Sequence, residues 1–281
     1  MDLLVTTDWL AARLGAFTIL DASAHLPASG RDAAAEFAEQ HIPGARFLSL
    51  GTLIDPESAT PSALPRGDQI AHRLGSLAVD PDKPIILYDN SVLRSSARAF
   101  LALSRAGIAN IAVLDGGFEK WLAEGRPVES GEGSHAPSIF RCTDCDDSGV
   151  RSKADVLANI ASKAEQLVDA RDADRFTAAS EDAVHGLAGG HIPGARNLWF
   201  RRLLDDDGTF KPAAELEKEF RDAGLDPAAP LIASCGSGMT ASVVLFAHRL
   251  LGHDHGALYD GSWSEWGADP STPKETGEAI G

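Results

Sequence analysis

The feature that most constrains the fold of this sequence is an internal repeat that covers most of the chain. The motif His41–Arg46 recurs letter for letter as His191–Arg196, 150 residues later. The segment Asp115–Trp121 is similar to Asp260–Trp266, with the same first, second and last residues, at a nearly equal displacement. A displacement that stays almost constant over a chain of 281 residues indicates two copies of one domain, not an array of small repeats.

Each copy alternates short apolar runs with helical patterns. In the first copy we expect strands over residues 17–20, 85–88 and 111–114, and helices over 7–13, capped by Thr7, and 95–105. In the second copy we expect strands over residues 167–169, 231–233 and 257–259, and a helix over 240–251. Alternation of this kind predicts an α/β protein with two tandem domains, each a mainly parallel sheet flanked by helices.

The segment between the copies is different in composition. It is rich in Gly, Ser, Pro and Asp and shows no periodicity, which is typical of a linker. We therefore expect an N-terminal domain over residues 1–125, a linker over 126–149 and a C-terminal domain over 150–281.

The most informative chemistry is at Cys235. An apolar run ends at this residue, a loop containing Gly236 and Gly238 follows, and an amphipathic helix begins at once. Such a turn directs backbone N–H groups toward one small site at the positive end of a helix dipole, which favours a thiolate. We expect both glycines to take the positive φ values that the turn requires. A buried lone cysteine is more often a small core residue, so the loop makes the difference.

The repeat supports a catalytic interpretation of this loop. A displacement of 145 aligns Cys235 with Asn90 and Gly238 with Leu93, so the first copy lacks both the sulfur and the loop glycines. If Cys235 served packing alone, a difference confined to this loop would have no explanation. We expect one active copy, the C-terminal one, and one inactive copy with Asn90 in place of the cysteine.

Composition and charge exclude several classes of partner. The formal net charge of −16 argues against binding to nucleic acid or to an anionic membrane surface. No segment has the apolar length of a membrane span, and the N-terminus does not resemble a secretory signal. Three cysteines, an odd and low number, indicate a reducing compartment. We therefore expect a soluble cytoplasmic protein.

Cys142 and Cys145 form a C-x-x-C pair in the acidic segment between the copies. The pair could be a redox centre or half of a zinc site, although a structural zinc site needs four ligands and the sequence has no second pair. We expect the flanking aspartates, Asp144 and Asp146 among them, to raise the thiol pKa values by like-charge repulsion. The simplest interpretation is an exposed linker with incidental thiols.

Two further patterns indicate a structural role or argue against an activity. His41 and His191 occur in both copies, and so we expect them to tie a turn before a strand, with no catalytic role. A cysteine phosphatase of related loop type would need an arginine where this chain has Ala241, so the sequence argues against that activity.

Taken together, these motifs resemble the tandem-domain rhodanese sulfurtransferases. The resemblance rests on the two His-Ile-Pro-Gly-Ala motifs, on the ending Asp260–Trp266 and on the loop Cys235–Thr240, and it runs from about residue 7 to 267. It implies the rhodanese fold, an active loop in the C-terminal half and an inactive N-terminal half. It also implies sulfur transfer through a persulfide on Cys235.

The resemblance further implies substrate-binding residues. The uncharged loop is similar to that of 3-mercaptopyruvate sulfurtransferases, whereas thiosulfate-preferring members carry cations there. Arg175 matches one of two donor-gripping arginines of the mercaptopyruvate enzymes, but the second position is Val184, and the run Asp182–Val184 resembles the thiosulfate enzymes. The donor stays open between these two compounds. The expected anion-binding residues of the loop are Gly236, Ser237, Gly238, Met239 and Thr240.

The expected reaction needs no metal and no organic cofactor. A small sulfur donor loads the cysteine, and a low-molecular-weight thiol, a thioredoxin-like protein or cyanide removes the outer sulfur. The alternative is a persulfide relay module that hands its sulfur to a partner protein without turnover.

Overall fold

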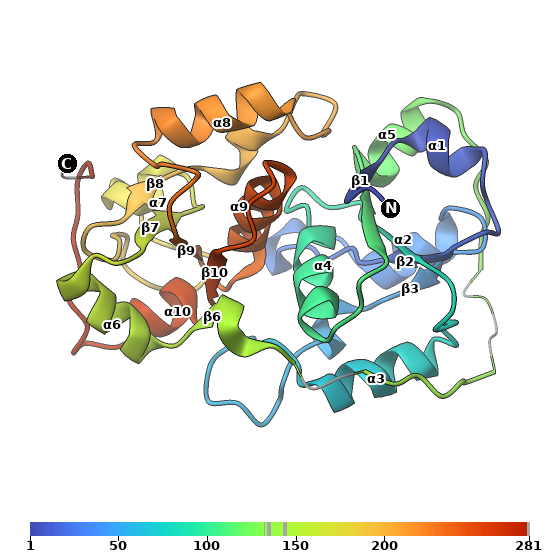
Figure 1. Ribbon diagram of the computed structural model, residues 1–281, viewed down its shortest axis with the longest axis horizontal. Helices are drawn as coiled ribbons and strands as arrows, with labels where there is room; N and C mark the ends of the chain where they lie inside the picture. The colour runs from blue at the N-terminus through green and yellow to red at the C-terminus, as the bar shows by residue number, and fades with distance from the viewer. Residues whose placement is uncertain (132, 134–135, 143–144, 280–281) are drawn as a thin grey trace. The chain divides into compact units, whose positions relative to one another are not determined.

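The structure is a computed structural model that describes the whole chain except residues 132, 134–135, 143–144 and 280–281 (Figure 1). It divides into two compact units. The N-terminal unit comprises Met1–Asp55, Leu64–Asp146 and Asp206–Thr209, and the C-terminal unit comprises Pro56–Ala63, Asp147–Asp205 and Phe210–Gly281. Each unit contains one five-stranded parallel sheet with helices packed against it, which confirms the predicted fold class.

The sheet of the N-terminal unit has the order β1-β5-β4-β2-β3, and all its pairs are parallel. Its strands are β1 (Leu4–Val5), β2 (Thr18–Asp21), β3 (Arg46–Phe47), β4 (Ile85–Tyr88) and β5 (Ile111–Leu114). Its helices are α1 (Thr7–Ala11), α2 (Ala33–Glu39), α3 (Gly67–Ser76), α4 (Ser96–Arg105) and α5 (Gly117–Ala123), with 3-10 turns at Pro27–Ser29 and Leu50–Thr52. Apolar residues of α1, α2 and α5 share one core cluster with alternate strand residues, whereas α4 contacts β4 and β5 outside that cluster.

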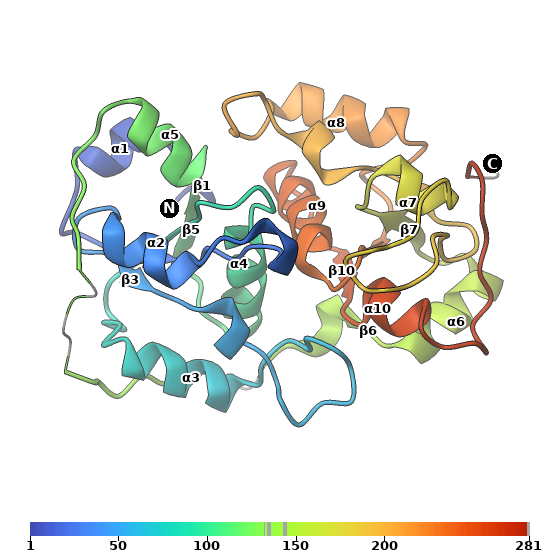
Figure 2. The same cartoon turned by 180° about the vertical axis from the view of Figure 1, so that it is seen from behind.

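The C-terminal unit repeats this plan with the order β6-β10-β9-β7-β8. Its strands are β6 (Val150–Arg151), β7 (Gln166–Asp169), β8 (Arg196–Asn197), β9 (Leu231–Ser234) and β10 (Gly256–Tyr259). Its helices are α6 (Lys153–Ser162), α7 (Ala173–Thr177), α8 (Ala213–Asp222), α9 (Met239–Leu250) and α10 (Ser262–Trp266), with 3-10 turns at Asp147–Gly149 and Phe200–Leu203. Residues of α6, α7 and α10 share a core cluster with the sheet, while α9 packs on β9 and β10 (Figure 2).

The repeated histidines have the structural role expected of them. Nδ1 of His41 donates to the carbonyl of Phe37 at 2.7 Å, and Nδ1 of His191 donates to the carbonyl of Phe176 at 2.9 Å. Each ring also stacks on the phenylalanine whose carbonyl it binds, with centroids 4.0 and 3.8 Å apart. Both imidazoles therefore tie a short helix, α2 or α7, to the turn that precedes the next strand.

Helix α1 begins at Thr7 as expected and ends at Ala11, two residues before the expected end, but its cap lies one residue earlier than the sequence indicates. The N-cap is Thr6, whose hydroxyl accepts a hydrogen bond from the amide of Trp9, so the expected cap at Thr7 is wrong. The Thr7 hydroxyl instead donates to Glu124 at 2.5 Å. Two adjacent threonines satisfy the same local rule, and a contact with a distant residue decides between them.

The segment expected as a linker is attached to the N-terminal unit along much of its described length. Glu129 pairs with His41 in an isolated bridge, and the amide of Ser138 donates to the carbonyl of Gly75 at 2.9 Å. Within the described part of the chain, no helix has the length and apolar character needed to cross a membrane.

Candidate active site

Cys235 is the first residue after β9, the central strand of its sheet, and only 2% of it is exposed. The residues Cys235–Gly238, here called the cysteine loop, lead directly into α9 (Figure 1). Ligands of open parallel sheets bind beyond the carboxyl ends of the strands, because the turns into the following helices meet there. The predicted strand, loop and helix are all present, and the sulfur lies at this edge.

Ser262 is the side chain that organises the cysteine loop. Its Oγ accepts hydrogen bonds from the amides of Cys235 and Gly238, both at 3.1 Å, and donates to the carbonyl of Tyr259 at 2.9 Å. Ser262 is fully buried and has a φ of +49°, which is uncommon for a residue with a side chain. We missed this residue in the sequence, although it is a position at which the two copies differ, since the first copy has Gly117 there.

The next two residues of α10 also bind the loop. The amide of Trp263 donates to the carbonyl of Cys235 at 3.0 Å, and the amide of Ser264 donates to the carbonyl of Gly236 at 2.8 Å. The amide of Gly238, one of the expected anion-binding residues, is bound to Ser262, and the anion-binding role of the loop stays a prediction. The amides without an acceptor among the described residues are those of Gly236, Ser237, Met239 and Thr240.

The two loop glycines are required for different reasons. Gly238 has a φ of +77°, as the sequence predicts. Gly236 does not have a positive φ, so the expectation for it is wrong, and the reason for the glycine is a close contact. A Cβ atom at Gly236 would lie 2.1 Å from Cε1 of His185, so any side chain there would displace the imidazole.

His185 is held against the loop by Asp182. Nδ1 of His185 lies 3.0 Å from Oδ1 of Asp182, which is fully buried. Burial alone would raise the pKa of Asp182, but the hydrogen bond from His185 and the charges of His185, Arg175 and Arg171 lower it to about 2. An ionised carboxylate only accepts hydrogen bonds, so Nδ1 is the donor and Nε2 is left for another partner.

Arg175, the predicted donor-gripping residue, belongs to the same network. Its Nε donates to Asp172 at 2.7 Å, and one terminal nitrogen lies 3.7 Å from Asp182. The guanidinium thus reaches the cysteine loop through Asp182 and His185, and part of its charge is already paired. Val184, at the position of the missing second arginine, is 45% exposed.

A second arginine, Arg171, joins the network through Asp182. It is 1% exposed, forms ion pairs with Asp169 at 2.7 Å and Asp182 at 3.3 Å, and donates to the carbonyl of Gly190 at 2.6 Å. Its guanidinium lies 4.6 Å from the ring centroid of Trp263. These contacts leave Arg171 buried and hold its guanidinium against Asp169 and Asp182, so we interpret it as a residue that positions other groups.

The strand registers identify the counterpart of Cys235 in the N-terminal unit. β4 and β9 end at the same register against β2 and β7, so the first residue after each is Asp89 or Cys235. The carbonyl of Asp89 accepts from the amide of Phe118 at 2.9 Å, as that of Cys235 does from Trp263. The expected equivalence with Asn90 is therefore wrong by one residue, because the loop lengths differ and an alignment by displacement cannot see this.

Asp89 places a buried carboxyl group in its own loop. The carboxylate is almost completely buried and accepts hydrogen bonds from the amides of Ser91 at 3.0 Å and Ser96 at 2.9 Å. Burial raises its pKa, while the charge of Arg94, 3.9 Å away, and these hydrogen bonds act against the rise. The N-terminal unit thus has the same frame with a carboxyl group in place of the sulfur.

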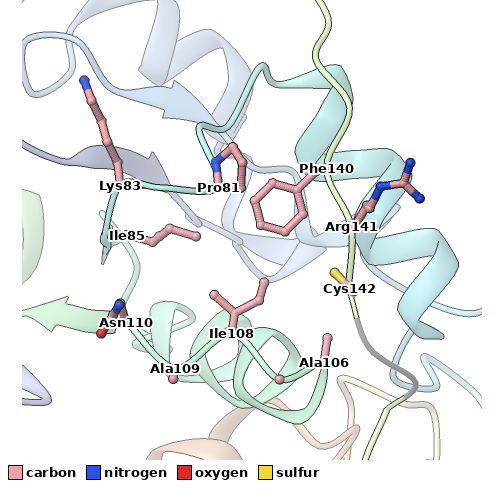
Figure 3. A pocket seen from close by; sticks show the side chains of 11 residues that line it. Pro81, Lys83, Ile85, Ala106, Ile108, Ala109, Asn110, Phe140, Arg141 and Cys142 are labelled. Atoms are coloured by element: carbon pink, nitrogen blue, oxygen red, sulfur yellow. The ribbon is translucent and has the colours of Figure 1, made fainter.

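Cys142 lies far along the chain from this site and lines a cavity of the N-terminal unit with Pro81, Ile108 and Phe140 (Figure 3). Cys142 and Cys145 are both half-buried, so the interpretation of an exposed linker is wrong for them. Burial, with Cys145 as a smaller cause, raises the pKa of Cys142 to about 11, and such a thiol is weakly nucleophilic at neutral pH. The direction is the expected one, but burial is its main cause; Asp144 lies outside the described residues.

Comparison with known proteins agrees with this geometry. The family model of the rhodanese-like domain matches residues 6–124 and 152–269. The 3-mercaptopyruvate sulfurtransferase of Rattus norvegicus is 36% identical over 94% of this chain and 91% of its own length. The thiosulfate sulfurtransferase of Cricetulus griseus is 37% identical over 98% of this chain and 96% of its own length.

Solved structures give the same result. SseA from Escherichia coli, described among the 3-mercaptopyruvate sulfotransferases, is 34% identical, with a TM-score of 0.84 over 94% of this chain and 99% of its own. The Tum1 protein of Saccharomyces cerevisiae is 26% identical, with a TM-score of 0.87 over 98% and 99% of the two chains. With two matching domains, two matching sheets and relatives that span almost its whole length, the chain belongs to the rhodanese family of sulfurtransferases.

Proposed function

We propose that this sulfurtransferase moves the thiol sulfur of 3-mercaptopyruvate to a thiol or to cyanide through a persulfide on Cys235. The observation that best supports the proposal is a buried sulfur at the end of the central strand, followed by four amides in the loop and the first turn of α9 that have no acceptor among the described residues. A persulfide anion on this sulfur would be stabilised by such donors, because they act in a site largely shielded from water.

The reaction has two balanced halves. The Cys235 thiolate attacks the donor sulfur, the carbon–sulfur bond breaks, and the carbon takes up the proton of the donor thiol, which gives pyruvate and a cysteine persulfide. An acceptor thiolate then attacks the outer sulfur, the sulfur–sulfur bond breaks, and the Cys235 thiolate is restored. Neither half requires an external oxidant or reductant.

The choice of donor rests on the charge of the loop. Ser237, Met239 and Thr240 are neutral, and a keto acid with one carboxylate needs less positive charge than a divalent anion such as thiosulfate. Arg175 is the guanidinium best placed to bind that carboxylate, although its bonds to Asp172 and Asp182 must rearrange for it to do so. Thiosulfate is the second candidate, because relatives of both kinds are similarly identical and Val184 breaks the arginine pair.

The persulfide is tested by intact-mass measurement after treatment with each donor. We expect an adduct of about 32 Da, the mass of one sulfur atom, that cyanide removes and that Cys235→Ala does not form. Steady-state turnover with parallel-line kinetics supports an enzyme. A single stoichiometric loading without turnover would instead support a relay module that serves a partner protein, and an unchanged mass would refute both.

The donor is tested by restoring the missing arginine. Val184→Arg should raise kcat/KM for 3-mercaptopyruvate by about tenfold, the value of a single charge-assisted contact, and change that for thiosulfate less. Val184→Leu is the matched control for side-chain size without charge. Equal effects of the two variants would contradict our interpretation of this position.

A further inference from the structure

A cluster of three histidines lies at the end of α9 that is remote from the cysteine loop. His248 is in the last turn of the helix, His253 is in the loop that follows, and His255 immediately precedes β10. One ring nitrogen from each residue can be chosen so that all three lie within 4.8 Å of one another. The three ring centroids are 4.9, 5.0 and 5.3 Å apart.

These separations match those of three imidazoles around one metal ion. With metal–nitrogen bonds of about 2 Å at tetrahedral angles, coordinating rings have centroids about 5 Å apart. The histidine rings form a nearly equilateral triangle of that size, and small side-chain rotations would bring the nitrogens to bonding distance. Simple stacking does not account for the arrangement, since two of the three pairs are edge-on.

The hydrogen bonding of His248 is that of a metal ligand. The ring is almost fully buried, and Nε2 donates to the carbonyl of Pro227 at 2.8 Å, so Nδ1 has the free lone pair. Histidine ligands usually donate their other ring N–H to a carbonyl or carboxylate, which fixes the orientation of the ring.

His255 contributes a second, independent observation. Its Nε2 is buried and has no hydrogen-bond partner in the described part of the chain. A buried polar nitrogen without a partner costs about 1–3 kcal/mol, so native structures rarely keep one unless an ion or water satisfies it. Asp254, between the other two ligands in sequence, adds a negative charge close enough to act on His248.

We propose that His248, His253 and His255 bind one divalent transition-metal ion of the Zn²⁺ type, with water at the fourth position. Three neutral imidazoles suit borderline ions such as Zn²⁺ and not Mg²⁺ or Ca²⁺, which prefer oxygen ligands. The ion would join the last turn of α9 to the start of β10 and, through His248, to the loop that holds Pro227.

The site is separate from the sulfur transfer. α9 has 12 residues, so its two ends are about 18 Å apart, and Cys235 precedes the opposite end. No metal takes part in the proposed reaction, and the inference of a metal site does not depend on that reaction.

The test is a titration of the chelator-treated full-length protein with Co²⁺, followed by its visible absorption, and then displacement by Zn²⁺. We expect one ion per chain and the intense spectrum of four-coordinate Co²⁺. His253→Gln and His255→Gln should each weaken binding by more than about tenfold, because even outer-shell partners are worth 10- to 100-fold. Circular dichroism of both variants verifies that they are folded.

Two controls keep the result specific. His72→Gln removes an exposed histidine of α3 and should leave binding unchanged, and Cys235→Ala should do the same, which excludes the thiol as a ligand. The proposal is overturned if folded wild-type protein binds no Co²⁺, if the spectrum is that of the hexa-aqua ion, or if the cluster variants bind as tightly as His72→Gln.

Discussion

The loops after β4 and β9 share one backbone frame and differ in what they enclose. In the N-terminal unit the frame encloses the carboxyl group of Asp89, which accepts hydrogen bonds from the backbone amides of Ser91 and Ser96. In the C-terminal unit the frame encloses the sulfur of Cys235, and the loop amides are arranged by Ser262 instead. The amides of Ser91 and Ser96 already bind a carboxyl group of the protein, so the N-terminal loop cannot offer those two donors to a substrate. The comparison therefore explains how one copy can lose the proposed activity while its fold is retained.

The position opposite each loop differs in a matching way. Gly117 has a φ of +61°, and a Cβ atom there would lie 2.4 Å from the carbonyl oxygen of Asp89. Ser262 has a similar φ of +49° but keeps its side chain, which accepts two loop amides. The C-terminal unit tolerates a strained serine because its hydroxyl holds the loop.

The largest effect on activity is expected when Cys235 is replaced by aspartate, the residue at the corresponding position of the N-terminal unit. Cys235→Asp should reduce sulfur transfer at least about 1,000-fold, because it removes the nucleophile and leaves a carboxylate among the free amides. Turnover with both donors measures this, and Cys142→Ser is the control that should keep full activity. The reciprocal variant Asp89→Cys, in a Cys235→Ala background, should gain none. Any donor-dependent turnover there would break the comparison.

A large loss of stability is expected when a second residue of the C-terminal unit is replaced by the residue at the corresponding position of the N-terminal unit. The registers align Arg171 with Ser23, so Arg171→Ser gives the C-terminal unit the residue of the other copy. Two buried carboxylates, Asp169 and Asp182, would lose their ion pairs with Arg171, and the free energy of unfolding should fall by about 3–5 kcal/mol. Urea unfolding measures this. The exposed pair of Arg221 with Glu217 offers the control: Arg221→Ser should change stability by less than about 1 kcal/mol.

In the N-terminal unit we expect the free energy of unfolding to depend on pH through a buried carboxyl group, that of Asp21. Burial raises the pKa of Asp21 from 3.8 to about 6 despite hydrogen bonds from Ser23 and Tyr88. Its contribution to stability is thus complete below pH 4 and is lost as the pH rises through 6, by at most about 3 kcal/mol. Asp21→Asn should remove this loss, so that its stability relative to wild type improves from pH 4 to 7.5. The exposed Asp82→Asn variant should show no such trend, and a parallel trend in both would refute the assignment.

The smallest effect is expected at the strained serine. Ser262→Gly copies Gly117 and frees two amides, so kcat should fall by about tenfold, the value of one to two net hydrogen bonds. The strain at a positive φ is relieved at the same time, so the melting temperature should change little. Ser264→Gly, which changes the neighbouring serine of α10, is the control. An unchanged kcat would mean that the loop holds its shape without Ser262.

Several elements of the molecule could be predicted from sequence because their signals are local. The apolar runs gave the bounds of β4 and β5, and those of α4 and α9 to within one residue, since hydrophobic period and glycine stops act over a few residues. The repeated motifs likewise determined that there are two sheets, and the order of strand, loop and helix around Cys235 determined where the sulfur lies.

Only the tertiary structure decided what surrounds that sulfur. The equivalence of Asp89 with Cys235 depends on strand register, which is set by pairing with residues far along the chain. Ser262 binds the cysteine loop from a position 27 residues further along the chain. His185, which packs against Gly236, lies in the connection between α7 and β8. Such contacts form because buried polar groups must find partners wherever packing brings them, and no local pattern in the sequence records which partner that will be.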